Sequence, residues 1–442
     1  MSIHKETAIV FVPGIEGTEM FYHNYKFWPP TLLDLPGYPD KKFKMMKEKA
    51  SVPGAVIGYA DFLAMYGWQL HDMITMCRNL DAEAIPFGYD WRGDIADAAR
   101  ELAAILLQKP YLRNIRFLCH SMGGLVCRYF LESNDPAIPQ TLKEKVSHLV
   151  GMCIPNLGAV DALASAFGLQ GIPTIDGTRV RELLLIEDFP GGYQLFPQAS
   201  HPSLFDNQGR PQNIYDPAVQ NRYLLSIKNT AAASRLHREL GLSKRPPHVK
   251  YFFGCGTGFP TDYKVVGDGL SDVRFYQTDG HSPASGDGRV EPWSSDPDPT
   301  IYSFTSAGSH LDVLAVKVFR DKMAAELGAG PLPPDALLLA EKSGAVVSIA
   351  RRDLQAGSTI TVLVIPQQSG PFPDGTLFVQ DIQDHGSEPA VLISDRRPEP
   401  LNGQTYRSLE IATPSKPGMY GLSFVGATIA SNSATEPVFR VL

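Results

Sequence analysis

Residues Arg116–Arg128 have the sequence RFLCHSMGGLVCR, and this stretch decides the fold. An apolar run predicts a β-strand over Ile115–Cys119, and the apolar residues that follow the glycine pair predict a helix. A serine between such a strand and helix fits a nucleophile elbow, where the hydroxyl projects above the sheet and small neighbours leave room for strained backbone. Ser121 holds that position, although Cys119 stands where the first glycine of GxSxG usually stands. The alternative is a helix N-cap serine followed by two glycines.

Further apolar runs place this turn in an α/β domain. Strands are predicted at Ala8–Val12, Ala84–Phe87 and His148–Ile154, and Ile95–Leu107 has the periodicity of an amphipathic helix. Strands that alternate with helices pair in parallel, because each crossover returns the chain to the same end of the sheet. We therefore expect residues 1–330 to form one α/β domain around a parallel sheet.

Two changes of pattern divide the rest of the chain. Gly- and Pro-containing segments between about 159 and 245 suggest an inserted cap over the sheet edge. Near 328–334 the sequence GAGPLPP marks a linker. After it, β-type runs at Thr359–Ile365, Thr376–Gln380 and Tyr420–Val425 recur between turn clusters, which predicts a C-terminal all-β, immunoglobulin-like sandwich over 335–442.

Composition excludes several classes of protein. The chain has 442 residues, 43% hydrophobic and 20% charged, and a net charge of −7, so it lacks the basic field that nucleic acid binding needs. Five cysteines without a CxxC pair suggest neither a disulfide framework nor a zinc site, and no metal is expected. The sequence contains no signal-peptide core and no membrane span. We expect a cytoplasmic protein, or one exported without a cleavable N-terminal signal.

Acyl transfer from a serine needs backbone N–H donors aimed at the developing oxyanion. Met122, the residue after the predicted nucleophile, supplies the first donor. The loop VPGIEGT follows the first predicted strand, and its two glycines allow a sharp turn. We predict Ile15 as the second donor; an ordinary glycine loop is the alternative.

The acid and the base of a hydrolase of this type follow the serine in the order Asp or Glu, then His. His310 precedes the last predicted helix of the domain and is the base we choose; the competing histidines are His201, His237, His248 and His281. Two Gly-Asp-Gly turns offer the acid. We choose Asp287, which lies 23 residues before His310, and keep Asp268 as the alternative.

Two aromatic segments are candidates for substrate binding. Phe27 and Trp28 end an aromatic-rich stretch after the glycine loop, and Tyr89 and Trp91 lie in Tyr-Asp-Trp-Arg at a strand end. Aromatic rings with polar atoms suit an acyl groove. Ordinary packing against the core is the other interpretation, and for the second segment structural support is favoured over substrate contact.

Eight segments in order resemble the lecithin:cholesterol acyltransferase family, which includes the group-XV-type lysosomal phospholipases. They span about residues 8–320: VPGIEGTEM, FGYDWR, CHSMGGLV, IPNLGAVDAL, PGGYQLFPQ, FGCGTGFPT, SGDGRVEP and GSHLDVL. The last two coincide with the segments that carry the family's catalytic Asp and His, at Asp287 and His310. The resemblance stops before the C-terminal sandwich, and no cysteine precedes Cys77 to form the lid disulfide of mammalian members.

The resemblance implies an α/β-hydrolase with a lid at about 19–53 and a lipid-binding cap. The expected enzyme is a lipase, phospholipase or O-acyltransferase that needs no cofactor and cleaves a fatty acyl ester through an acyl-serine intermediate, with a phospholipid as the expected substrate. A lipid substrate is the expected partner, with peripheral membrane contact as a further expectation and no nucleic acid; the sequence leaves open whether the C-terminal domain binds a protein. The alternatives are a soluble esterase or amidase for a small substrate and a catalytically silent binding protein with this fold.

Overall fold

The computed structural model describes residues 4–31, 34, 38–58, 65–172, 175–277, 285–332, 343–350, 353–367, 375–381, 387–393, 399–401, 404–426, 430–431 and 438–441. His281 therefore lies outside the described residues.

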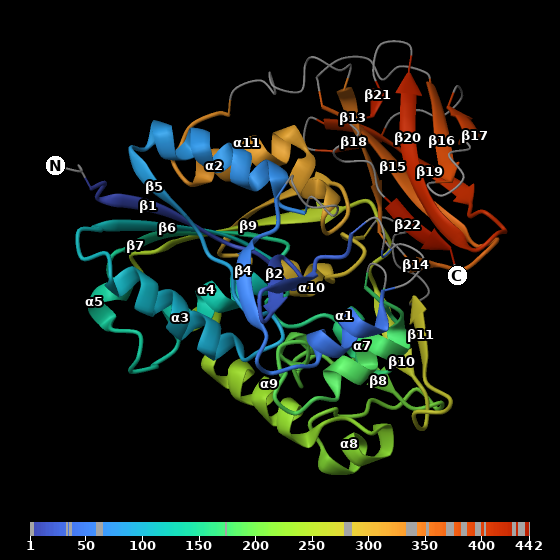
Figure 1. The fold of residues 1–442 in the computed structure, drawn as a ribbon, viewed down its shortest axis with the longest axis horizontal. Helices are drawn as coiled ribbons and strands as arrows, with labels where there is room; N and C mark the ends of the chain where they lie inside the picture. Colours follow the sequence, from blue (N-terminus) through green and yellow to red (C-terminus); the bar gives the residue numbers. More distant parts are fainter. Residues whose placement is uncertain are drawn as a thin grey trace.

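A six-stranded sheet forms the centre of the N-terminal part (Figure 1), and all of its pairings are parallel. In spatial order the strands are β12 (Tyr302–Ala307), β9 (Lys250–Thr257), β7 (Val146–Met152), β6 (Asn114–His120), β1 (Thr7–Val12) and β5 (Ala82–Pro86). Four of them, β1, β5, β6 and β7, overlap the runs predicted from the sequence, with bounds that differ by at most two residues, and the parallel sheet agrees with the predicted α/β fold class. Apolar side chains on both faces explain why these strands are continuous apolar runs rather than alternating ones.

Helices cover both faces of this sheet, with α2 and α11 on one side and α3, α4 and α5 on the other (Figure 1). Their bounds are α2 (Gly67–Asn79), α3 (Ile95–Leu107), α4 (Met122–Glu132), α5 (Gln140–Lys143) and α11 (Lys317–Glu326). The predicted helix at Ile95–Leu107 has the same bounds in the structure. It begins there because the Asp94 carboxylate caps it, accepting from the Ala96 N–H at 3.0 Å.

The segment after β1 forms a small sheet of its own. Strands β3 (Tyr25–Trp28), β2 (Thr18–Tyr22) and β4 (Val52–Val56) pair antiparallel in that order, and α1 (Asp40–Met46) lies between β3 and β4 in the chain. These elements cover the range in which the sequence predicts a lid.

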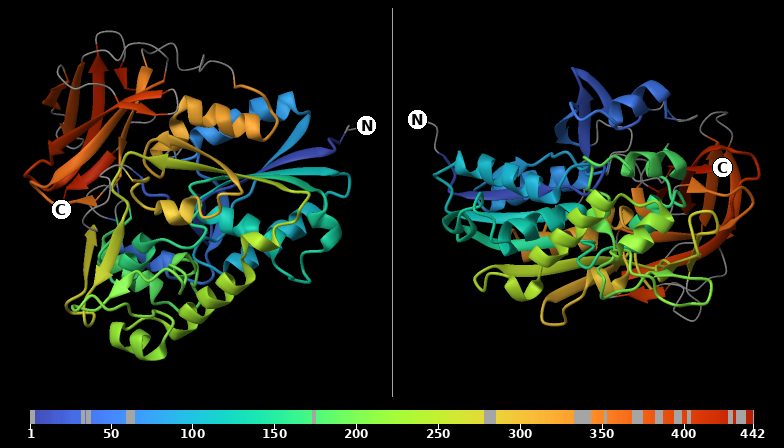
Figure 2. Two further views of the ribbon diagram at one scale, coloured as in Figure 1. Left: turned by 180° about the vertical axis from the view of Figure 1, so that it is seen from behind. Right: turned by 90° about the horizontal axis from the view of Figure 1, so that it is seen from below.

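The chain between β7 and β9 and the segment after β9 build a second, smaller apolar core. The elements are α6 (Val160–Ala166), α7 (Gly177–Leu184), η2 (Tyr193–Leu195), β8 (Leu204–Phe205), α8 (Pro217–Tyr223), α9 (Ile227–Glu239), η3 (Leu242–Lys244), β10 (Tyr263–Val266) and β11 (Arg274–Gln277). Strands β11, β10 and β8 pair in that order. The views from front and below show this group beside the central sheet (Figures 1 and 2).

The described C-terminal segments are strands: β13 (Ser343–Ile349), β14 (Asp353–Leu354), β15 (Thr359–Pro366), β16 (Gly375–Asp381), β17 (Ser387–Ile393), β18 (Glu399–Leu401), β19 (Gln404–Ala412), β20 (Gly418–Gly426), β21 (Ala430–Ser431) and β22 (Val438–Val441). Three of them contain the predicted β-runs. Val347 of β13 and Val364 of β15 belong to the same separate apolar core as Leu422 and Phe424 of β20.

Two further observations bear on predictions from the sequence. All five cysteines are buried and free. Among the described residues, no helix combines the length and the apolar character that crossing a membrane requires.

Candidate active site

Ser121 lies at the turn between β6 and α4, and its backbone is strained. Its φ is 51° and its ψ is −126°, a conformation that few residues other than glycine adopt. The small residues beside it are required by the packing, because a Cβ on Gly123 would lie 2.3 Å from the Pro13 carbonyl oxygen. Cys119, at the position of the missing glycine, is fully buried, so a small thiol fits there. The strand–turn–helix context agrees with a nucleophile elbow rather than with an N-cap, since the Ser121 side chain makes no capping bond.

The structure brings Ser121, His310 and Asp287 together. His310 Nε2 lies 2.9 Å from Ser121 Oγ, and His310 Nδ1 lies 2.8 Å from Asp287 Oδ2. All three side chains are largely buried. A carboxylate that contacts Nδ1 holds the imidazole with Nε2 free to accept the serine proton, so the geometry has the order needed for nucleophilic catalysis.

Backbone groups fix the Asp287 carboxylate. Its Oδ1 accepts from the N–H groups of Arg289 at 2.9 Å and Val290 at 2.8 Å, while its own carbonyl oxygen accepts from the His310 N–H at 2.9 Å. The acid and base loops are therefore joined through both side chain and backbone.

Asp268 has different neighbours. It accepts from the Asn207 backbone N–H at 3.1 Å and from Asn207 Nδ2 at 2.8 Å, both in exposed positions. Among the described residues it makes no contact with His310. His201 stacks on Trp293, His237 contacts the Tyr215 hydroxyl and His248 lies near the Lys143 carbonyl oxygen, so these histidines have other partners.

The predicted oxyanion donors lie in the glycine loop, at Ile15, and directly after the serine, at Met122. A Cβ on Gly14 would lie 2.8 Å from Ser121 Cβ, which shows how closely the glycine loop approaches the nucleophile. The Gly14 N–H is occupied, because it donates to the Tyr66 hydroxyl at 2.8 Å. Within the described part of the chain, the N–H groups of Ile15 and Met122 donate to no other protein group. Met122 is the first residue of α4, where an N–H has no partner within the helix.

The predicted substrate-binding aromatics are buried, and two of them hydrogen-bond to the glycine loop. The Trp28 indole N–H donates to the Glu16 carbonyl oxygen at 2.8 Å, and the Tyr89 hydroxyl donates to the Pro13 carbonyl oxygen at 3.0 Å. Trp91 packs edge-on against Trp28, with 5.9 Å between ring centroids, and Phe27 is fully buried. These contacts support the loop; direct contact with substrate stays a prediction.

Asp90 and Arg92 of the same segment form an ion pair that ties neighbouring segments together. Arg92 Nη2 lies 2.6 Å from Asp90 Oδ2, and Arg92 also donates to the Glu48 carbonyl oxygen at 3.2 Å. The guanidinium lies over the Phe189 ring, 4.4 Å from its centroid. The lid range, the core and the cap range therefore meet at Arg92.

Sequence reasoning missed His120 and Tyr66, which lie next to the serine in space. Burial and the nearby His310 lower the pKa of His120 well below its usual value, so the ring is neutral. His120 Nε2 lies 3.0 Å from the His310 carbonyl oxygen, which can only accept, so Nε2 carries the proton. Nδ1, 2.8 Å from the Tyr66 hydroxyl, is then the acceptor. The position of His120 directly before the serine could have marked it as part of the site. Its partners, Tyr66 and the His310 carbonyl oxygen, are distant in sequence and could not be found from it.

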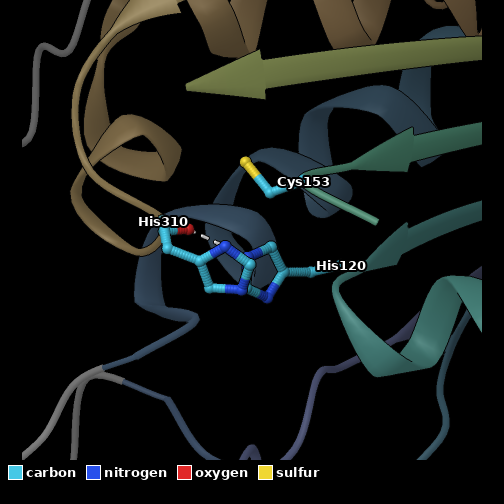
Figure 3. Close-up of side chains that lie close together, drawn as sticks. All are labelled: His120, Cys153 and His310. Carbon is cyan, nitrogen blue, oxygen red and sulfur yellow. Dashed lines mark hydrogen bonds between the residues drawn. The ribbon is translucent and has the colours of Figure 1, made fainter. Parts of the chain in front are cut away.

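His120, Cys153 and His310 cluster closely enough to be considered as metal ligands (Figure 3). One donor atom of each lies within 4.8 Å of the others. Both nitrogens of each histidine already have hydrogen-bond partners. Burial and the Asp287 charge raise the pKa of the Cys153 thiol well above its usual value, which disfavours the thiolate that metals bind. The donor set fits a hydrogen-bonded network better than a metal site.

Comparison with known proteins gives one family match. Residues 58–216 match the family model of lecithin:cholesterol acyltransferase, a range that includes Ser121 and much of the cap range but neither Asp287 nor His310. No curated protein matches significantly.

Proposed function

We propose that this chain is a serine-dependent lipid acyl hydrolase or O-acyltransferase, because residues 58–216 match the family model of lecithin:cholesterol acyltransferase. That match supports acyltransferase or phospholipase-type activity on lipids. The finer proposal is cleavage of a fatty acyl ester, of a phospholipid in the first instance, through an acyl-serine intermediate. The domain arrangement that goes with it is an α/β-hydrolase domain with lid and cap over 1–330 and a β-sandwich over 335–442.

One observation carries this proposal: the hydrogen-bonded chain from Ser121 Oγ through the His310 ring to Asp287, at a serine with positive φ. In the proposed mechanism His310 Nε2 takes the Ser121 proton as Oγ attacks the ester carbonyl carbon. Asp287 stabilises the imidazolium that forms. The N–H groups of Ile15 and Met122 stabilise the oxyanion.

Collapse of the tetrahedral intermediate breaks the ester C–O bond and leaves the acyl group on Ser121. His310 gives its proton to the departing alkoxide, here the lysolipid or other alcohol. Water or a second alcohol then attacks the acyl-serine and loses its proton to His310. The second tetrahedral intermediate breaks its bond to Ser121 Oγ and releases the fatty acid or a new ester, and His310 returns the proton to Oγ.

The test is mass spectrometry of lipids after incubation of the wild type and Ser121→Ala with phospholipid vesicles that contain sterol. Free fatty acid and lysolipid made only by the wild type would establish a phospholipase, and an acylated sterol would establish a transferase. Lipids unchanged by both proteins would contradict the proposal for phospholipids.

Two further assays separate the alternatives. A lipid enzyme should prefer long-chain p-nitrophenyl esters, whereas preference for short chains would favour a soluble esterase. Failure of Ser121 to react with a fluorophosphonate probe would favour a catalytically silent binding protein.

A further inference from the structure

The loop that carries His310 is held by a strand from the C-terminal part of the chain. The Ser348 hydroxyl, in β13, accepts from the Ser309 N–H at 2.9 Å and donates to Asp312 Oδ2 at 3.1 Å. Ser348 is fully buried, and Ser309 and Asp312 are nearly so. One side chain therefore contacts the residue before His310 and the residue two positions after it.

The Asp312 carboxylate joins the His310 loop to β13 through further hydrogen bonds. Its Oδ2 also accepts from the Ser309 hydroxyl at 2.7 Å and from the Ile349 N–H at 3.2 Å. A buried carboxylate is tolerated only when donors surround it, so movement of β13 away from the loop would leave this oxygen with fewer partners. The network therefore favours a single position of the loop relative to β13.

The acid loop contacts the residue that follows this strand. A Cβ on Gly288, next to Asp287, would lie 2.4 Å from the Ala350 Cβ, and Gly288 itself has a φ of +84°. A Cβ on Gly258, at the end of β9, would lie 2.5 Å from Leu363 Cδ1 of β15. Both loops that supply the proposed acid and base thus pack against the C-terminal strands.

Apolar packing and a second polar contact extend this interface. The Gln367 side chain accepts from the Lys317 N–H at 2.8 Å and donates to the Ala315 carbonyl oxygen at 2.9 Å. One buried apolar cluster spans both parts of the chain and includes Val313, Leu314, Phe319, Val346, Leu363 and Tyr406. Figures 1 and 2 show the C-terminal strands, orange to red, lying beside α11.

We propose that the C-terminal strands belong to the support of the active site, with Ser348 as a positioning residue that fixes the His310 loop through Ser309 and Asp312. The inference rests on the proposed function, since it concerns the base of that reaction. It gives the C-terminal part a role in turnover besides any role in stability. A small displacement of a catalytic group is enough to slow chemistry strongly without changing substrate binding.

The test compares the wild type, Ser348→Ala, Ser121→Ala and two control variants in the full-length chain, with a p-nitrophenyl ester as substrate. Thr413→Val is the first control, because it removes a buried C-terminal hydroxyl that donates to the Gln355 carbonyl oxygen at 2.7 Å. Gln367→Leu is the second, because it disturbs the same interface away from His310. The measurements are kcat per mole of protein, KM and the thermal midpoint.

We expect Ser348→Ala to lower kcat by about tenfold or more, with KM within about twofold of the wild type. The two controls should lower the thermal midpoint comparably while keeping the wild-type kcat. If Ser348→Ala does not fold, Ser348→Cys, which weakens both hydrogen bonds at nearly the same size, replaces it.

A Ser348→Ala variant with wild-type kcat, beside an inactive Ser121→Ala, would overturn this inference alone. Absence of turnover in the wild type, or full turnover in Ser121→Ala, would instead overturn the proposed function together with the inference that rests on it.

Discussion

The ring of His120 donates from Nε2 to the backbone carbonyl oxygen of His310, over a distance of 3.0 Å. The residue before the proposed nucleophile therefore holds the backbone of the proposed base. Through Nδ1 and the Tyr66 hydroxyl the same ring is linked to the Gly14 N–H of the glycine loop. Three separate loops of the site are thus joined by one chain of hydrogen bonds around a neutral histidine.

Tyr66→Phe should lower kcat by roughly tenfold or more, because it leaves the Gly14 N–H without an acceptor and His120 Nδ1 without a donor. Steady-state kinetics on a p-nitrophenyl ester measure the effect. Tyr215→Phe is the matched control, since the Tyr215 hydroxyl donates to the Pro197 carbonyl oxygen at 2.9 Å in the cap range. Equal kcat values for the two variants would show that the Tyr66 hydroxyl does not support the site.

Asp287→Asn should lower kcat by about 10³- to 10⁴-fold with little change in KM, because the imidazolium loses its carboxylate partner. Asp268→Asn should stay near the wild type, since Asp268 contacts Asn207 instead. The reverse result, an inactive Asp268→Asn beside an active Asp287→Asn, would exchange the two assignments.

Gly123→Ala should destabilise the protein by about 2 kcal/mol or more and reduce labelling of Ser121 by a fluorophosphonate probe. The added Cβ would lie 2.3 Å from the Pro13 carbonyl oxygen and 2.4 Å from that of Val12, so β1 and the glycine loop would have to move. Gly269→Ala is the control, because nothing lies within 4 Å of a Cβ there. Thermal unfolding of both variants should separate them, and equal midpoints would contradict the close approach.

Glu291→Gln should stabilise the protein increasingly as pH rises. Burial and the charges of Asp161 and Asp287 raise the pKa of Glu291 well above its usual value. Above the unfolded-state pKa the unfolded chain releases this proton while the folded chain keeps it, so stability falls with rising pH until the folded pKa is reached. The slope is up to about 1.4 kcal/mol per pH unit for one group. Glutamine resembles the neutral acid but does not ionise, so the variant does not lose this stability as pH rises.

Denaturant unfolding at pH 5 and pH 8 tests the prediction, with the variant's advantage expected to grow between the two. Glu326→Gln is a control of opposite sign. Burial tends to raise the pKa of Glu326, but hydrogen bonds from Lys250 and Lys322 lower it overall. That carboxylate therefore stabilises the fold above its unfolded-state pKa, and its replacement should cost stability at pH 8. A pH-independent difference for Glu291→Gln would contradict a neutral Glu291.

The sequence alone determined the α/β class, the four strands around Ser121 and the helix Ile95–Leu107, because burial periodicity and the Asp94 cap are local properties. It also pointed to Asp287 and His310, since loops after late strands are where such a fold places acid and base. Only the tertiary structure decided which Gly-Asp-Gly turn reaches the imidazole. Both turns have the same local sequence, and only their places in the chain favoured Asp287; in the structure the backbone of the His310 loop bonds to Asp287.

The supporting contacts lay beyond the sequence for the same reason. Tyr66 lies 54 residues from His120, His120 lies 190 from His310, and Ser348 lies 36 from Asp312. No periodicity or motif in the sequence links the two residues of any of these pairs. They meet because the order of strands in the sheet and the packing against the C-terminal strands bring distant segments of the chain together. Local pattern fixes elements and turns, whereas the position of one side chain against a distant one is set by the packing of the whole fold.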